Sequence, residues 1–333
     1  MKCIFLLALS LLFYGCGRDS YAIRIAGEAQ GTTYQVTYFS EDNVNYQAAV
    51  DSILQTIDLS LSTYVPTSII SRINRNDSTV RLDTYFTEVF KASMEVSKTT
   101  GGLFDVTVAP LVNAYGFGFT AKAAVDSFMI DSLLNLVGYR KIRLEGDQFV
   151  KEKPGIMIDF NAIAQGYTVD VLAAFLDKRN IGSYLIELGG EVKAKGKKMN
   201  NEYWKVGIDV PNEMPDNERK LHAVVKLNNR SLATSGNYRK FYVENGKKYA
   251  HIIDPRTGYP ANSNLLSVSV IAGDCITADA YATAFMVMGI ERSKQFLTTN
   301  PDLGLQVYFI YDEEGRLKTY TSPSLQQSIE TIN

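Results

Sequence analysis

A histidine, an aspartate and an arginine lie close together in one turn-forming segment of the sequence. Residues 251–260 have the sequence HIIDPRTGYP and follow an expected strand. Proline and glycine fix the backbone of such a turn, so it can hold functional groups rigidly. His251 is one of only two histidines, and a histidine near its ordinary pKa accepts a proton at neutral pH. Composition alone favours an ordinary loop with an Asp-capped turn.

A second candidate site is the segment TADAYAT at residues 277–283. Asp279 and Thr283 are four residues apart and share one face of an expected helix, where they offer two hard oxygen ligands. Magnesium prefers a few protein oxygens completed by water and phosphate. Alone, however, an aspartate near a helix N-terminus more often complements the helix dipole. No G-x-G-x-x-G or P-loop motif is present, which argues against a Rossmann enzyme.

Further short motifs occur in a fixed order along the chain. They are GTTY at 31–34, STY at 62–64 with Pro66 and Ser68, GLFD at 102–105 before PLVN at 110–113, DFNAIAQGY at 159–167, LGGE at 188–191 and TSGNY at 234–238. Each is weak alone. Together with HIIDPRTGYP and TADAYAT, the set closely resembles the ApbE family of flavin transferases, over nearly the whole chain after residue 22.

The resemblance implies positions for the metal and the flavin. It places Mg²⁺, or another divalent cation such as Ca²⁺ or Mn²⁺, on Asp279 and Thr283 with backbone oxygens of Ala162 and Ala282. Tyr64 would stack on a ring of FAD, although a lone tyrosine is more often a core aromatic. The other residues implied to bind the cofactor are Gln30, Leu103, Phe104, Asp105, Asp159, Gln165 and Ile253.

Two positions depart from the family pattern. Family members often carry lysine where this chain has Gln165, and glycine where it has Asn161. A cation is therefore lost beside the expected flavin site. If that lysine contacts the flavin or its phosphates, flavin affinity or the choice between transfer and hydrolysis differs in this chain.

The activity implied by the resemblance is transfer of FMN from FAD, with release of AMP, to a threonine or serine hydroxyl. The acceptor would be the flavin-carrying subunit of a membrane redox complex, and His251 would be the base. One alternative is an FAD pyrophosphatase that uses water as the nucleophile and yields FMN and AMP. Another is a non-catalytic FAD-binding lipoprotein, in which His251 and the metal ligands are incidental.

Periodicity indicates the elements that position these groups. Residues 23–39 are expected to be extended. Helices are expected over 47–61, 84–99, 126–138 and 164–178, and from Thr277 into the 290s. Strands are expected at 156–159, 184–188, 203–210, 222–227 and 265–271, with hairpins around Asn245-Gly246 and Glu314-Gly315. The fold class is therefore α+β with mixed, largely antiparallel sheets and packed helices, in one catalytic unit over residues 23–333. The resemblance implies a T-fold-related, ApbE-like architecture.

Composition and charge argue against a nucleic-acid-binding protein. The chain has 333 residues, of which 46% are hydrophobic and 21% charged, as in an average globular protein. The net charge is −2 and no basic block stands out, so a nucleic-acid partner is not supported.

The first residues have the features of an export signal. Lys2 precedes an apolar run from Ile4 to Phe13, about half the length that a bilayer span needs. Gly15-Cys16 resembles the end of a lipoprotein signal, with Phe13 where leucine is usual. We expect residues 1–15 to be removed, Cys16 to be acylated and 16–22 to form a short linker. The protein would then be lipid-anchored to a bacterial membrane and face the periplasm.

Overall fold

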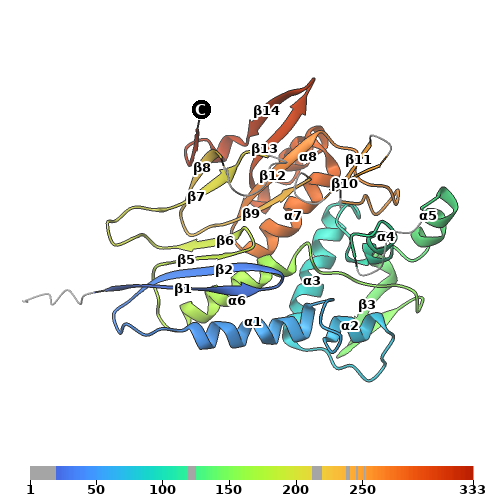
Figure 1. Ribbon diagram of the computed structural model, residues 1–333, viewed down its shortest axis with the longest axis horizontal. Coiled ribbons are helices and arrows are strands. Elements are labelled where there is room, and N and C mark those ends of the chain that lie inside the picture. Colours follow the sequence, from blue (N-terminus) through green and yellow to red (C-terminus); the bar gives the residue numbers. More distant parts are fainter. Residues whose placement is uncertain are drawn as a thin grey trace, which may run out of the picture.

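The computed structural model describes residues 20–118, 125–211, 220–237, 241–244, 247–250 and 252–332. Its centre is an eight-stranded sheet with the order β1-β2-β5-β6-β9-β12-β13-β14, in which every neighbouring pair is antiparallel (Figure 1). The strands are β1 (Tyr21–Ala29), β2 (Thr32–Ser40), β5 (Tyr184–Leu188), β6 (Glu191–Lys195), β9 (Ser231–Gly236), β12 (Leu265–Ala272), β13 (Gln306–Glu313) and β14 (Arg316–Thr321).

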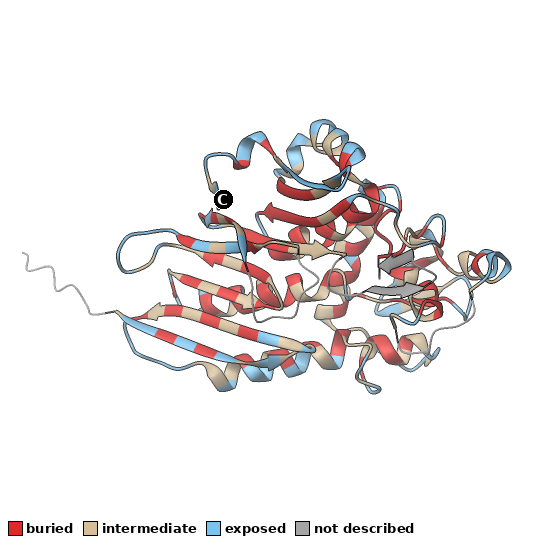
Figure 2. Ribbon diagram, turned by 45° about the horizontal axis from the view of Figure 1, so that its top comes forward, coloured by how far each residue is buried: buried red, intermediate tan, exposed pale blue. Residues whose placement is uncertain are grey.

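Two helices pack on this sheet and on each other. They are α6 (Ala164–Asp177), which contacts β5 and β6, and α7 (Cys275–Met288), which contacts β9 and β12. Eleven of the fourteen residues of α7 are buried, so this helix has almost no exposed face (Figure 2). A polar residue on α7 is therefore held in a dry environment, where it needs a partner.

The remaining elements surround this core. The helices are α1 (Gln47–Leu61), α2 (Ile69–Asn74), α3 (Thr84–Thr99), α4 (Ala109–Ala114), α5 (Ser127–Leu134) and α8 (Ile290–Thr299), and the short 3₁₀ helix η1 covers Val106–Val108. β7 (Trp204–Asp209), β8 (Leu221–Leu227) and β15 (Ile329–Thr331) form a three-stranded sheet, and β3 (Ile142–Glu145) pairs with β4 (Gln148–Lys151). β10 (Phe241–Glu244) pairs with β11 (Lys247–Ala250).

The α+β class with largely antiparallel sheets is confirmed, and α1 and α3 have the bounds that their apolar periodicity predicts. Asp83 begins α3 because its side chain accepts a hydrogen bond from the Phe86 amide at 2.8 Å. The apolar spacing puts Phe86, Val89, Phe90 and Met94 on one face of α3, and the first three of them are buried. The helix expected over 126–138 ends earlier, at Leu134.

Residues 23–39 are extended, as expected, and form two strands of a hairpin, β1 and β2, with the turn at Gln30 and Gly31. Two expectations were wrong in detail. The helix expected from Thr277 into the 290s breaks at Gly289, whose φ of 75° is left-handed and ends α7 before α8 begins. Residues 156–159 are not a strand, because the Ile158 amide bonds to the Asn74 side chain at 2.8 Å and the Asp159 amide bonds to the Val106 carbonyl at 2.8 Å.

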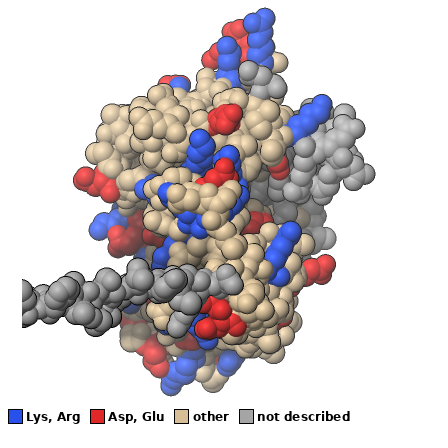
Figure 3. Space-filling model, turned by 90° about the vertical axis from the view of Figure 1, so that its left-hand side faces the viewer, with Lys and Arg blue, Asp and Glu red and all other residues tan. Residues whose placement is uncertain are grey.

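Cys3, Cys16 and His251 lie outside the residues that the structure describes. Cys275 is the free cysteine of the described residues; it is buried like a small apolar residue, and burial raises the pKa of its thiol. Within the described segments, each helix is too short or too polar to cross a membrane. On the face shown in Figure 3, acidic and basic side chains lie interspersed.

Candidate functional site

The α6–α7 crossing brings the backbone of Gly166 against Asp279. The Gly166 amide donates a hydrogen bond to Oδ2 of Asp279 at 3.0 Å. A Cβ atom on Gly166 would lie 2.4 Å from the Cys275 carbonyl oxygen and 2.7 Å from Cβ of Asp279. Only glycine permits this approach, which holds the Asp279 carboxylate against the first turn of α6.

The Asp279 carboxylate is buried, and no cationic side chain of the described residues forms an ion pair with it. Asp279 is only 8% exposed, and none of the ion pairs among the described residues includes Asp279. Burial raises the pKa of Asp279 to about 7, and the Gly166 amide opposes that rise. A buried carboxylate with this environment suits a bound divalent cation, which would supply the missing positive charge.

The other expected metal ligands are oxygen donors of the same region. Thr283 follows Asp279 by one helical turn and is half-buried, as is Ala162 just before α6, whereas Ala282 is buried within α7. In the described part of the chain, no group of three or more His, Cys, Asp and Glu side chains could hold a metal ion. The donor set is therefore sparse, with hard oxygens that fit Mg²⁺ better than a softer metal.

The raised pKa of Asp279 predicts a pH-dependent stability of the metal-free protein. Its ordinary pKa is 3.8 and its folded pKa about 7, so the folded state binds more protons between these values and loses stability as pH rises through that interval. Asp279→Asn keeps an acceptor for the Gly166 amide and removes the charge. In the presence of a chelator, the wild type should lose stability from pH 5 to pH 8 and the variant should not. The free energy of unfolding of the variant, relative to that of the wild type, should therefore rise by about 2 kcal/mol over this interval.

Denaturant unfolding of both proteins at the two pH values measures this difference. If the variant and the wild type differ in free energy of unfolding by the same amount at pH 5 and at pH 8, the pKa of Asp279 is not raised in the folded protein.

Two of the expected cofactor residues lie around the start of α6. Gln30 occupies the β1–β2 turn with a φ of 53°, and its Nε2 donates to Oγ1 of Thr168 at 2.9 Å. The side-chain amide of Gln165 lies against the β5–β6 turn, since a Cβ on Gly189 would be 3.1 Å from Nε2 and 3.2 Å from Oε1. The structure thus brings both glutamines to the same end of α6 as Asp279.

Tyr64 and Asp159 form a second group. Tyr64 is 65% exposed, so it is not a core aromatic, and part of its side chain faces solvent. The buried part of the side chain still raises the pKa of Tyr64, and the negative charge of nearby Asp159 adds to the rise. Asp159 accepts hydrogen bonds from the backbone amide of Asn161 at 2.6 Å and from its side-chain amide at 3.0 Å. Asn161, where the family often has glycine, therefore fixes the Asp159 carboxylate.

Leu103, Phe104 and Asp105 form the third group, and their side chains point into the fold. Leu103 is 8% and Phe104 3% exposed. Asp105 accepts hydrogen bonds from the Thr107 amide at 2.8 Å and from the Tyr139 amide at 2.7 Å. Burial raises the pKa of Asp105, opposed by these bonds. The three side chains shape the loop, so any ligand would meet this segment through its backbone.

The segment at 252–260 is a tight turn that docks on α5. Ile253 is buried and bridges to Pro260. Both oxygens of Asp254 accept hydrogen bonds from the Arg256 side chain, at 3.1 and 2.9 Å. Burial raises the pKa of Asp254, but the bonds to Arg256 outweigh it and the pKa lies below its ordinary value. Gly258 has a φ of 75°, and a Cβ there would lie 2.5 Å from Cγ2 of Ile130.

Comparison with known proteins identifies the family of the chain. The sequence model of the ApbE family matches residues 30–309. The chain belongs to the ApbE family. It is 33% identical to an FAD:protein FMN transferase of Vibrio cholerae, with 96% of each chain covered. It is 30% identical to the FAD:protein FMN transferase of Escherichia coli K12, with 96% of this chain and 95% of that one covered.

Solved structures of the family have the same fold. Flavin transferase ApbE from Vibrio cholerae superposes with a TM-score of 0.82 at 31% identity, covering 93% of this chain and 100% of that one. The apo form of Pseudomonas stutzeri flavinyl transferase ApbE gives a TM-score of 0.82 at 29% identity, over 93% and 97% of the two chains. The ApbE fold in this chain is thus shown independently of the motifs.

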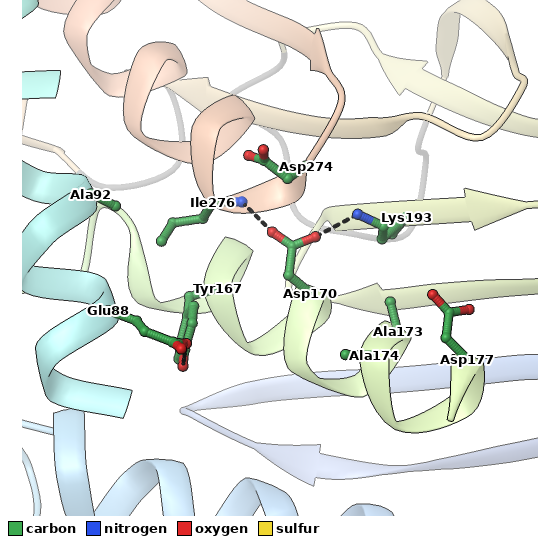
Figure 4. Close-up of a pocket in the computed structure, with 10 residues that line it drawn as sticks. All are labelled: Glu88, Ala92, Tyr167, Asp170, Ala173, Ala174, Asp177, Lys193, Asp274 and Ile276. Atoms are coloured by element: carbon green, nitrogen blue, oxygen red, sulfur yellow. Dashed lines mark hydrogen bonds and ion pairs between the residues drawn. The ribbon is translucent and has the colours of Figure 1, made fainter. Parts of the chain in front are cut away.

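One group of polar residues in this ApbE protein belongs to none of the sequence motifs. Asp170, on α6, pairs with Lys193 of β6 at 2.7 Å, and its other oxygen faces the start of α7 (Figure 4). These residues line an open groove of about 450 Å³ that contains none of the expected site residues. The partners of Asp170 lie 23 and more than 100 residues away in the sequence, so no local motif could indicate them.

Proposed function

We propose that this protein is a metal-dependent FAD:protein FMN transferase that moves FMN from FAD to a threonine or serine hydroxyl of a partner protein and releases AMP. The observation that carries the proposal is the buried carboxylate of Asp279, which has no cation partner within the described structure and shares a helix face with Thr283. The names of the relatives agree with transfer of FMN to a protein.

Asp279 and Thr283, with backbone oxygens of Ala162 and Ala282, would hold Mg²⁺, Ca²⁺ or Mn²⁺. A bound cation supplies electrostatic stabilisation for the charge that develops on the FAD phosphates. Gly166 fixes the Asp279 carboxylate from the backbone. The metal ligands of the protein are then in place before the substrate binds, so no free energy is spent on reorganising them during the reaction.

The remaining residues of the proposed site bind FAD, and one of them acts as a general base. The exposed ring of Tyr64 stacks on a flavin or adenine ring, and Gln30 and Gln165 offer amide groups at the start of α6. The acceptor hydroxyl oxygen bonds to the phosphorus of the FMN half, the pyrophosphate bond breaks, and AMP leaves with the bonding electron pair. His251 accepts the hydroxyl proton.

FAD hydrolysis remains the second candidate, because Gln165 stands where the family often has lysine and leaves the start of α6 without that cation. Incubating the protein with FAD and Mg²⁺, with and without a flavoprotein acceptor, separates the two. Transfer predicts AMP release that depends on acceptor, whereas hydrolysis predicts equal release without it. Steady AMP release in either case would exclude a non-catalytic FAD-binding lipoprotein.

We also propose that Cys16 carries lipid and tethers the enzyme to a bacterial membrane, outside the cytoplasm. An acceptor subunit of a membrane redox complex would then lie within reach. Cys16→Ser should release an active, soluble enzyme, because no residue of the proposed site precedes Gln30. Stable attachment needs more than one acyl chain. Membrane fractionation with an FAD turnover assay tests this, and a variant that stays fully membrane-bound would favour an uncleaved anchor.

A further inference from the structure

Asp170 connects α6 to the beginning of α7. One carboxylate oxygen, Oδ2, accepts hydrogen bonds from the backbone amides of Cys275 at 2.8 Å and Ile276 at 2.9 Å. These are the first two amides of α7, which have no partner inside the helix. Asp274 satisfies the third by accepting from the Thr277 amide at 2.9 Å. Asp170 is therefore a cap supplied from another helix.

The other oxygen of Asp170 contacts the sheet. Oδ1 accepts from Nζ of Lys193 on β6 at 2.7 Å, and the two side chains are only 18% and 19% exposed. A buried carboxylate needs such compensation. The Asp170 side chain thus connects α6 to both the central sheet and the N-terminus of α7 (Figure 4).

The periodicity of both helices links this contact to Asp279. Gly166 and Asp170 are four residues apart on α6, and Cys275 and Asp279 are four apart on α7, so each pair shares a helix face. Gly166 meets Asp279 through its amide, and Asp170 meets Cys275 through its carboxylate. The two contacts, one turn apart, fix both the distance and the axial register of α7 against α6.

We infer that Asp170 is a positioning residue for the proposed metal site, acting through the first turn of α7 to hold Asp279 in its ligating position. This inference rests on the proposed function, in which Asp279 binds the metal. Asp170 itself lies at the groove and is not assigned to metal or flavin.

The chain contains a matched control. Asp177 lies seven residues after Asp170 on α6, and it pairs with Lys195 of β6 at 2.9 Å. The elements and the types of residue are the same. However, Asp177 receives its other described hydrogen bond from the Tyr184 hydroxyl rather than from α7. Asp177→Asn therefore removes an ion pair between the same two elements, a more exposed one with side chains 43% and 42% exposed, without touching the α7 cap.

Asp170→Asn tests the inference because the asparagine has nearly the same size but cannot present oxygens on both sides. Its NH₂ group must face either Lys193 or the α7 amides, and both are donors. We expect Mn²⁺ titration followed by electron paramagnetic resonance to show affinity about 10- to 100-fold weaker than in the wild type. Hydrogen exchange of peptides covering 274–279 should accelerate about tenfold in the metal-free protein. Asp177→Asn should change neither.

The outcomes separate the inference from the function on which it rests. Wild-type exchange at 274–279 in Asp170→Asn, or wild-type Mn²⁺ affinity despite faster exchange, would overturn the positioning role. An equal effect in Asp177→Asn would also overturn it, because loss of any ion pair would then suffice. Asp279→Asn reports on the proposed function instead: if it binds Mn²⁺ like the wild type, the metal site is elsewhere and the inference falls with it.

Discussion

We expect Asp279→Ala to lower metal-dependent FAD turnover by more than about 10³-fold while the fold stays intact. A cation at this position supplies several kcal/mol of charge stabilisation, and each 1.4 kcal/mol changes the rate about tenfold. Asp279 is buried and has no other positive partner among the described ion pairs, so its loss cannot be compensated nearby. AMP release measured over a range of Mg²⁺ concentrations quantifies the effect.

Asp279→Asn separates the charge from the hydrogen bond. Asparagine can still accept from the Gly166 amide, which binds Oδ2 of Asp279 at 3.0 Å, but it brings no negative charge to a cation. Both variants should therefore be inactive, and circular dichroism should show that both are folded. Full wild-type turnover in excess chelator would refute the metal proposal.

The second large effect concerns His251. We expect His251→Ala to reduce the rate of FMN transfer by about 10² to 10⁴, the usual contribution of a positioned acid or base, with little change in FAD affinity. Affinity should come mainly from the Tyr64 ring and from a cation on the FAD phosphates. Single-turnover rates at saturating FAD, together with flavin fluorescence titrations, measure the two quantities separately.

His222→Ala is the matched control, because His222 lies on β8 with Nδ1 3.0 Å from the Tyr308 hydroxyl and outside the proposed site. It should retain the transfer rate. If His251→Ala instead weakens FAD binding and keeps its single-turnover rate, His251 is a binding residue. Asp254 would then be the nearest alternative base, although its hydrogen bonds to Arg256 lower its pKa and make it a weak one.

The sequence predicted the long amphipathic helices best. In α1 and α3 the apolar spacing sets the buried face, and at Asp83 a capping side chain marks the first turn of α3. The central strands β6 and β9 were missed, because they are short and contain few large apolar residues, so their sequences, EVKAK and SLATSG, give only a weak strand signal. The apolar run before Asp159 resembled a strand, but the Asn74 side chain satisfies its backbone instead.

For the candidate site, the motifs predicted the identity of the residues but not the contacts that position their side chains. Asp279 and Thr283 were found from their spacing on one helix. The burial of Asp279, the amide of Gly166 against it and the cap from Asp170 depend on contacts 105 or more residues apart in the sequence. Such contacts are set by tertiary packing, so the positioning of α7 could be seen only in the structure.

The most direct test of the proposed function is mass spectrometry of a flavoprotein acceptor after incubation with this protein, FAD and Mg²⁺. Transfer predicts that the acceptor gains the mass of one FMN less one water, on a threonine or serine, and that AMP appears in equal amount. The gain should be absent with Asp279→Ala. Rapid AMP release with no mass gain on any acceptor offered would contradict transfer and identify the protein as an FAD hydrolase.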